Sequence, residues 1–158
     1  MATHLLERSQ RIPGDQDAVF EFFADAHNLE EITPPWLHFR ITEAPDRVSG
    51  GAKIEYRLRL HGLPVRWVSR IEDWEPPHRF ADTQVRGPYA LWHHTHTVEP
   101  DGDGVVMRDR VRYSLPLGPL GELIHRAVVK RDLARIFDYR REAIERRFGA
   151  AVPAGDAA

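Results

Sequence analysis

Two histidines with strand-like spacing are the residues of this chain best suited to chemistry. Residues 89–99 alternate as a β-strand does, and one face of that strand carries Trp92, His94, His96 and Val98. We expect this face to point inward, because Trp92 and Val98 bracket the two imidazoles with apolar side chains. Buried polar groups are usually hydrogen-bonded, so we expect polar side chains beside the two imidazoles.

The turns before this strand predict some of those neighbours. The Gly-Pro turn that precedes it places Asp82 beside His94 and Gln84 beside Trp92. One strand further back, across the Pro-Pro connection, Ser69 is brought toward Asp82. We therefore expect a hydroxyl and a carboxylate on the same inner face as the imidazoles.

The turn after this strand predicts a second carboxylate. The Asp-Gly-Asp-Gly stretch is a hairpin signal, and it places Asp109 opposite His94 and Met107 opposite His96. The expected inward band consists of Ser69, Asp82, His94 and Asp109, with Gln84 and His96 nearby.

Four interpretations of this band remain open. It can be a hydrogen-bonded network that only anchors the sheet, or a patch through which His94, His96, Gln84 or Asp109 fixes the polar end of an apolar guest. It can be an acid–base site in which Asp82 or Asp109 orients His94, as a cyclase, dehydratase or isomerase requires. The fourth interpretation is a metal site of His94, His96 and one carboxylate. His-x-His is a weak motif, so we expect no metal and no cofactor.

The elements that must position this band follow from periodicity. A strand at 2–12 precedes two short helices, the first with Asp15 as N-cap and the second covering Ala26 to Ile32. Six antiparallel strands follow, with the clearest alternation at 53–60. Residues 120–148 lack Pro and Gly and have helical spacing of apolar residues, which predicts a helix of about 44 Å.

This order predicts an α+β fold in which a curved antiparallel sheet of about seven strands wraps around a long C-terminal helix. The chain has 158 residues, and we expect one domain at 1–148 with a flexible tail at 149–158. It has no cysteine, a net charge of −2 and no long apolar run. These features argue against disulfides, nucleic-acid binding and membrane insertion, and we expect a cytoplasmic protein.

Four segments also resemble a known superfamily: 28–37 (NLEEITPPWL), 60–67 (LHGLPVRW), 80–96 (FADTQVRGPYALWHHTH) and 109–116 (DRVRYSLP). With the element order, they make the chain similar to START-related helix-grip (SRPBCC) proteins, and most of all to small bacterial members labelled polyketide cyclase/dehydrase-like or ligand-binding. The resemblance implies a cavity between sheet and helix that holds a mostly apolar molecule such as a lipid, polyketide, quinone or aromatic compound.

We therefore expect a binding module for a small or medium apolar ligand. The candidate ligand-binding residues are Tyr56, Trp67, Ser69, Gln84, Trp92, His94, His96, Met107, Tyr113 and Phe137. The alternative is a cofactor-free enzyme of the cyclase/dehydratase type that uses His94 with Asp82 or Asp109 as catalytic residues. A third possibility is protein contact through the basic outer face of the sheet; a protein partner or a dimer has no other support in the sequence.

Overall fold

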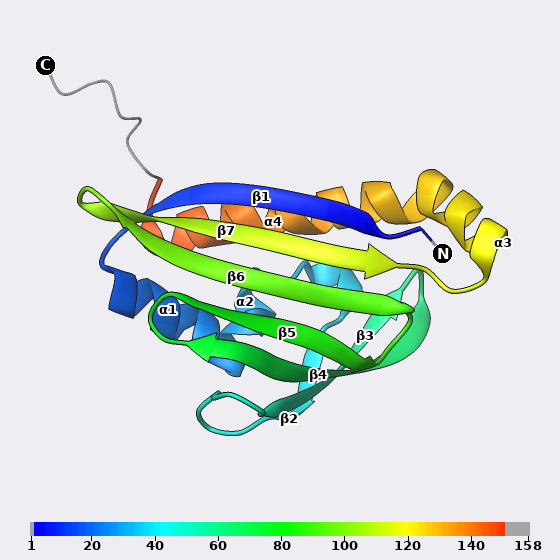
Figure 1. The fold of residues 1–158 in the computed structure, drawn as a ribbon, viewed down its shortest axis with the longest axis horizontal. Helices are drawn as coiled ribbons and strands as arrows, with labels where there is room; N and C mark the ends of the chain where they lie inside the picture. The colour runs from blue at the N-terminus through cyan, green and yellow to red at the C-terminus, as the bar shows by residue number, and fades with distance from the viewer. Residues whose placement is uncertain (1, 151–158) are drawn as a thin grey trace, which may run out of the picture.

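A computed structural model describes residues 2–150, in which seven strands form one open antiparallel sheet (Figure 1). The strands are β1 (His4–Pro13), β2 (Arg40–Glu43), β3 (Lys53–Leu60), β4 (Leu63–Glu75), β5 (Arg79–Arg86), β6 (Leu91–Asp101) and β7 (Gly104–Ser114). Their order across the sheet is β1-β7-β6-β5-β4-β3-β2, so the first strand lies beside the last. The predicted helix-grip α+β class is confirmed.

Helices occupy the two predicted regions of the chain, and one short helical turn at 35–37 lies outside them. The helical segments are α1 (Gln16–Ala24), η1 (Ala26–Asn28), α2 (Leu29–Ile32), η2 (Pro35–Leu37), α3 (Gly118–Ile124), a π-helical turn η3 (His125–Val129) and α4 (Lys130–Phe148). The predicted C-terminal helix is thus one continuous helical run with a π-helical turn inside it. In Figure 1, α4 lies along β1 and β7, whereas α3 lies beyond the end of the sheet.

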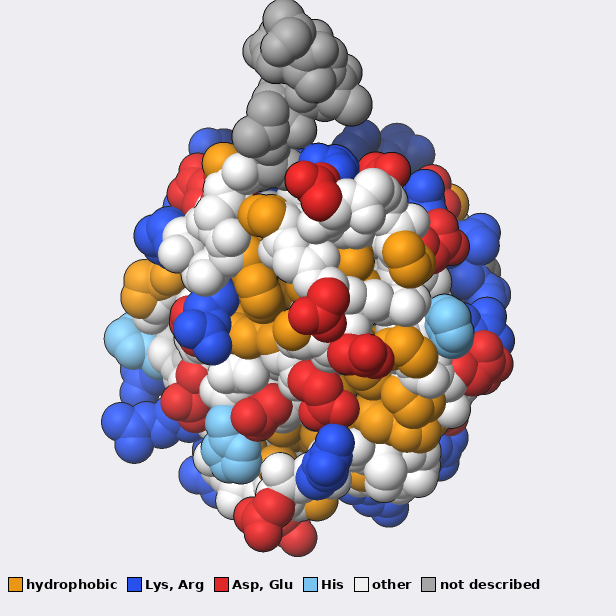
Figure 2. All heavy atoms as spheres, turned by 90° about the vertical axis from the view of Figure 1, so that its left-hand side faces the viewer, with side chains coloured by type: hydrophobic (Ala, Val, Ile, Leu, Met, Phe, Trp, Pro, Cys, Tyr) orange, Lys and Arg blue, Asp and Glu red, His pale blue; other side chains and the backbone are white. Residues whose placement is uncertain are grey.

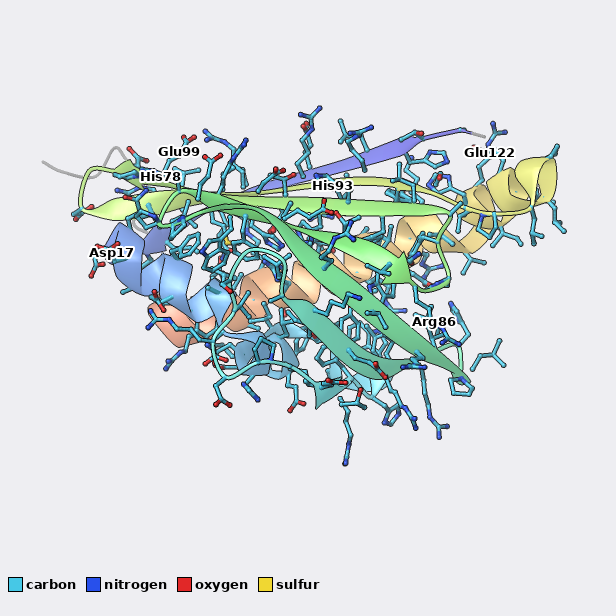
Figure 3. The ribbon with its side chains drawn as sticks, turned by 60° about the horizontal axis from the view of Figure 1, so that its bottom comes forward. Asp17, His78, Arg86, His93, Glu99 and Glu122 are labelled. Carbon is cyan, nitrogen blue, oxygen red and sulfur yellow. The ribbon has the colours of Figure 1, made fainter. Side chains whose placement is uncertain are left out.

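The predicted inward face of β6 is confirmed. Trp92, His94, His96 and Val98 are all buried, and the residues between them are only half-buried. Because side chains alternate between the two faces of a strand, His93 points to the outer face, where Figure 3 shows it. There its Nδ1 lies 2.8 Å from the hydroxyl of Thr83.

The predicted register between β6 and β7 is wrong by two residues. His94 lies opposite Val111, and His96 lies opposite Asp109, whereas we expected Asp109 opposite His94 and Met107 opposite His96. The reason is that a two-residue turn closes this hairpin, with Asp101 paired to Gly104. A shift of two residues keeps every side chain on its predicted face.

The register between β4 and β5 is also wrong by two residues. Ser69 lies opposite Gln84, and Ile71 lies opposite Asp82. The reason is that the hairpin closes around residues 76–78, with Glu75 paired to Arg79, further along the chain than the predicted pairing requires. The predicted pairing of Asp82 with His94 is confirmed.

The polar band divides the core into two hydrophobic clusters. One cluster contains Val98 of β6, Met107 of β7 and Ile144 of α4, and the other contains Trp92, Val111 and Phe137 of the same three elements. On each element the polar residues lie between the members of the two clusters. The polar residues in this position are His94 and His96 on β6, Asp109 on β7 and Arg140 on α4.

The surface has mixed charge at the end of the molecule that carries α1. Figure 2 shows acidic and basic side chains there side by side, with apolar atoms between them and no continuous basic patch. No helix among the described residues is long and apolar enough to cross a membrane. Of the tail predicted at 149–158, residues 151–158 lie outside the described part.

Asp15 offers a test of how the sequence starts α1. Its side chain accepts a hydrogen bond of 2.9 Å from the backbone N–H of Ala18, as expected for an N-cap. Asp15→Ala is expected to lower the free energy of unfolding by about 1 kcal/mol, measured by urea denaturation. Asp17→Ala is the matched control with a smaller expected loss, because Asp17 lies in the first turn and acts through the helix dipole. Equal losses in the two variants would contradict the capping role.

Candidate functional site

A cavity of about 190 Å³ lies between the inner face of β3 to β6, the segment from α1 to η2, and α4. Its walls are mostly apolar and aromatic, with Trp67, Trp92 and Phe137 among them. Its polar lining includes Ser69, Asp82, His94, His96 and Arg140. An apolar hollow with a few convergent polar groups is the usual form of a small-molecule site.

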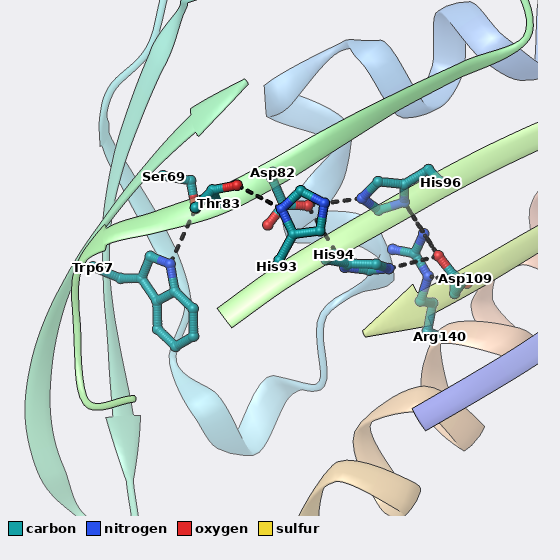
Figure 4. Close-up of polar contacts among 9 residues, drawn as sticks. All are labelled: Trp67, Ser69, Asp82, Thr83, His93, His94, His96, Asp109 and Arg140. Carbon is teal, nitrogen blue, oxygen red and sulfur yellow. Dashed lines mark hydrogen bonds and ion pairs between the residues drawn. The ribbon is translucent and has the colours of Figure 1, made fainter. Parts of the chain in front are cut away.

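His96 bridges the two carboxylates of the band (Figure 4). Its Nε2 lies 2.7 Å from Asp82 Oδ2, and its Nδ1 lies 3.1 Å from Asp109 Oδ1. Phe80 stacks on the ring with centroids 4.5 Å apart. Burial lowers the pKa of His96, but the hydrogen bonds and charges of Asp109 and Asp82 outweigh that effect and raise the pKa above its ordinary value. These two contacts and the raised pKa favour the protonated form of His96, in which both ring N–H groups face carboxylates.

His94 is paired on one side only. Its Nε2 lies 2.8 Å from Asp109 Oδ1, whereas its Nδ1 is 3.6 Å from Asp82 Oδ2, too far for a hydrogen bond. Burial and the neighbouring His96 lower the pKa of His94, although Asp109 and Asp82 oppose this. His94 is therefore a neutral imidazole that donates from Nε2 and keeps a lone pair on Nδ1.

Arg140 brings the second cation into the band from α4. Its guanidinium lies 3.2 Å from Asp109 Oδ1 and 3.4 Å from Asp109 Oδ2, and its Cζ is 5.1 Å from the ring centre of Phe23. Burial raises the pKa of Asp109, but Arg140 and the two histidines outweigh burial and hold it well below its usual range. The carboxylate is ionised, and both His96 and Arg140 contact its Oδ1.

Asp82 faces the cavity from β5. Its side chain is 20% exposed, compared with 10% for Asp109, and it lines the cavity whereas Asp109 does not. Burial raises its pKa, but the hydrogen bond from His96 and the charges of His94, His96 and Arg140 together lower it. With two carboxylates, one imidazolium and one guanidinium, the charges of the band balance.

Most of the predicted site residues meet at this cavity. Those that line it are Tyr56, Trp67, Ser69, Asp82, Trp92, His94, His96 and Phe137. Gln84, Met107, Asp109 and Tyr113 do not line it. Met107 packs in the apolar core, and Gln84 bonds the backbone of Tyr89 through both ends of its amide.

Arg140 is the site residue that strand alternation alone did not find. Residues 138–141 (DYRR) contain two adjacent arginines, and strand alternation says nothing about which of them points inward. The signal is present in the helix, because Leu133, Phe137, Arg140 and Ile144 follow the spacing of one buried stripe. An arginine on that stripe requires a buried carboxylate partner, and Asp109 is the one that the fold provides.

Asp82, His94 and His96 also come close enough to be considered as metal ligands, with one ligand atom of each within 4.8 Å of the others. Both ring nitrogens of His96 already face carboxylates, and Arg140 Nη2 lies 3.5 Å from its Nδ1. A cation placed here would meet two positive charges. The charge balance therefore favours a hydrogen-bonded network over a metal site.

Comparisons with known proteins agree with the fold. A family model described as polyketide cyclase / dehydrase and lipid transport matches residues 3–149. A START superfamily protein from Mycobacterium smegmatis is 12% identical, with a TM-score of 0.70 over 92% of this chain and 97% of that one. The ginseng (Panax ginseng) major latex-like protein 151 is 15% identical, with a TM-score of 0.65 over 92% and 97% of the two chains.

A nucleoside-diphosphate sugar epimerase from Corynebacterium glutamicum contains a similar domain. It is 20% identical, with a TM-score of 0.64, and the likeness covers 88% of this chain and 28% of the epimerase. No functionally curated protein matches the chain in sequence. At these identities the solved structures establish the shared fold and not a shared chemistry.

The raised pKa of His96 predicts how stability depends on pH. Its contribution is fully present below the unfolded value of about 6.5 and is lost as the pH rises through the folded pKa. We therefore expect the free energy of unfolding of the unmodified chain to fall as the pH rises above about 6.5. His96→Gln should remove this fall. The measurement is urea denaturation across that range.

His93→Gln is the matched control for this experiment, because His93 lies on the outer face and outside the band. It is expected to keep the pH dependence of the unmodified chain. If His96→Gln and His93→Gln give the same pH profile, His96 is not held as an imidazolium by the two carboxylates.

Proposed function

Because the chain belongs to the polyketide cyclase / dehydrase and lipid transport family, we propose that it binds a small, mostly apolar molecule in the cavity between the sheet and α4. Membership of this family confirms the predicted relationship to SRPBCC and START-related proteins. The observation that carries the proposal is the cavity itself, with aromatic walls and the ionised Asp82 on its surface.

The size of the cavity limits the guest. An apolar cavity of roughly 150 Å³ is large enough for benzene, and drug-sized ligands occupy roughly 300–1,000 Å³. The cavity of about 190 Å³ lies between these values. The guest is therefore a compact molecule of one or two rings, or a chain of similar volume, within the predicted lipid, polyketide, quinone and aromatic classes.

The polarity of the lining predicts where the guest has its polar group. Asp82 is an ionised acceptor whose side chain is partly exposed at the cavity, and His94 offers an unbonded Nδ1 on the same wall. A hydroxyl on the guest donates to either of them, while the aromatic walls bury its rings.

The proposal includes a cytoplasmic location, which the absence of cysteine supports, and no partner beyond this guest.

Binding is testable with 1-naphthol and naphthalene as probes. Saturating 1-naphthol is expected to raise the melting temperature of the chain by linkage, and naphthalene is expected to raise it less. Asp82→Asn should reduce the preference for 1-naphthol, because the amide is a weaker acceptor than the carboxylate.

Ala26→Leu tests whether the probe occupies the cavity. Ala26 is buried and lines the hollow, so a larger side chain there takes up guest volume and is expected to weaken binding at least about 10-fold. Ala127→Leu is the matched control at an exposed helical position. A chain stabilised by neither probe, or an Ala26→Leu variant that binds as tightly as the control, contradicts the proposal.

The second candidate is a cofactor-free enzyme of the cyclase/dehydratase type. The observation that favours it is the unbonded Nδ1 of His94 at the cavity, on an imidazole whose pKa is lowered by burial, because a general base needs an available lone pair. In this mechanism His94 removes a proton from a carbon next to a carbonyl of the guest. Asp109 is a positioning residue that fixes the Nε2–H tautomer, and Asp82 faces the imidazolium that forms.

Proton exchange at 2-tetralone tests the base. We expect the chain to accelerate deuterium exchange next to the carbonyl, measured by NMR. The rate should rise with pH through the lowered pKa of His94, since only the neutral imidazole accepts a proton. His94→Gln should remove the acceleration and preserve the binding of naphthalene, which has no hydroxyl to donate to His94. An unchanged rate in His94→Gln, or no acceleration by the unmodified chain, excludes this candidate in favour of simple binding.

A further inference from the structure

A second cluster of histidine and carboxylate lies outside the cavity, where β1 meets the start of the C-terminal helical run. It consists of His4 on β1, Glu122 on α3 and His125 at the π-helical turn, and Figure 3 shows Glu122 at this end of the molecule. One ligand atom of each residue lies within 4.8 Å of the others. None of the three residues lines the proposed guest site.

His125 has a hydrogen-bond partner at one ring nitrogen and none at the other. It is 6% exposed, and its Nε2 lies 2.8 Å from the hydroxyl of Tyr113. Its Nδ1 is buried and has no hydrogen-bond partner, the one such side-chain atom found among residues 2–150. When Nε2–H donates to Tyr113, Nδ1 carries a lone pair directed at no donor. A buried unsatisfied acceptor costs free energy unless something fills the position.

The other two residues place ligand atoms beside that lone pair. Glu122 Oε1 lies 4.0 Å from His125 Nδ1, and Glu122 Oε2 lies 3.0 Å from His4 Nε2. Glu122 and His125 are three residues apart on a helical run, a spacing that puts a carboxylate and an imidazole on one face and that helical metal sites use. Ligand atoms bound at about 2.1 Å to a tetrahedral ion lie roughly 3.4 Å apart. This separation falls between the two distances that Glu122 makes to the histidines.

The backbone fixes this arrangement where α3 begins. A Cβ added to Gly121 would overlap the carbonyl oxygen of Pro116, so the close approach of helix and loop requires glycine at this position. The close packing holds Glu122 beside β1. The π-helical turn then begins at His125, and such turns are frequent at functional sites.

One side chain must move for ligation. The rings of His4 and His125 are stacked with centroids 3.5 Å apart and an angle of 15°, so both lone pairs cannot converge on one ion in this conformation. The side chain of His4 is 19% exposed, whereas the side chain of His125 is 7% exposed and bonded to Tyr113. His4 is therefore the ring that rotates. Arg126, 3.5 Å from Glu122 and 76% exposed, can turn into solvent.

We propose that His4, Glu122 and His125 form a binding site for a divalent first-row transition-metal ion such as Zn²⁺. Two imidazoles and one carboxylate leave a fourth position open for water or another ligand. Tyr113 accepts the Nε2–H of His125 and so orients the metal-binding nitrogen, as outer partners do in metal sites. This site differs from the cavity band, where Arg140 opposes a cation.

Zinc titration of the full chain without a histidine tag, after treatment with a chelator, tests the site by calorimetry. We expect one ion to bind per chain and to raise the melting temperature. His4→Gln, Glu122→Gln and His125→Gln should each weaken binding at least about 10-fold. His4→Gln is the decisive variant because His4 is only partly buried and contributes little to the core. Co²⁺ in place of Zn²⁺ should give visible absorption that the three variants lack.

His61→Gln is the matched control, since His61 lies against a single carboxylate, Asp132, in an exposed pair. It should bind zinc as the unmodified chain does. Asp82→Asn distinguishes the two clusters, and it should also leave zinc binding unchanged. The proposal fails if the unmodified chain binds no zinc, if His4→Gln binds it with unchanged affinity, or if Asp82→Asn is the variant that weakens binding.

Discussion

Arg140 carries a guanidinium from α4 into the space between helix and sheet, where little water is available to solvate it. Asp109 of β7 meets it at 3.2 and 3.4 Å, and the pair ties one point of the helix to one point of the sheet. Removing one partner of a buried pair leaves an uncompensated charge, at a general cost of about 3–5 kcal/mol. The rotation of α4 about its axis is therefore constrained, and Phe137 and Leu133 are presented to the cavity from the same face.

The same carboxylate orders the imidazoles. Asp109 Oδ1 lies within hydrogen-bonding distance of His94, His96 and Arg140, and Asp82 accepts a hydrogen bond from Nε2 of His96. The two imidazoles consequently differ, since His96 is charged and bridging whereas His94 is neutral and bonded on one side. Structural and functional interpretations of the band are thus compatible. Asp109 and Arg140 hold the sheet and helix together, and Asp82 and His94 are the members that would accept a hydrogen bond from the proposed guest.

The band also explains why the hollow has one polar wall. It separates two apolar clusters, and the aromatic side chains of the second cluster, including Trp67 and Trp92, close around the cavity. A guest with a hydroxyl matches both surfaces, because its rings replace water on the apolar walls and its polar atom meets an acceptor. The cluster of His4, Glu122 and His125 is separate from this arrangement, and its unbonded nitrogen lies where β1 and α3 meet.

The order of the elements, the facing of each strand and the strand residues of the band follow from the sequence, because a strand repeats every two residues and a helix every 3.6. Asp15, the inward face of His94 and His96, and the pairing of Asp82 with His94 follow from such local patterns. Only the tertiary structure decided that Asp109 faces His96 across the ladder and that Arg140 joins it. Register depends on where a turn closes, and the partner of a buried charge depends on how a distant helix packs. Neither is encoded in the spacing of neighbouring residues.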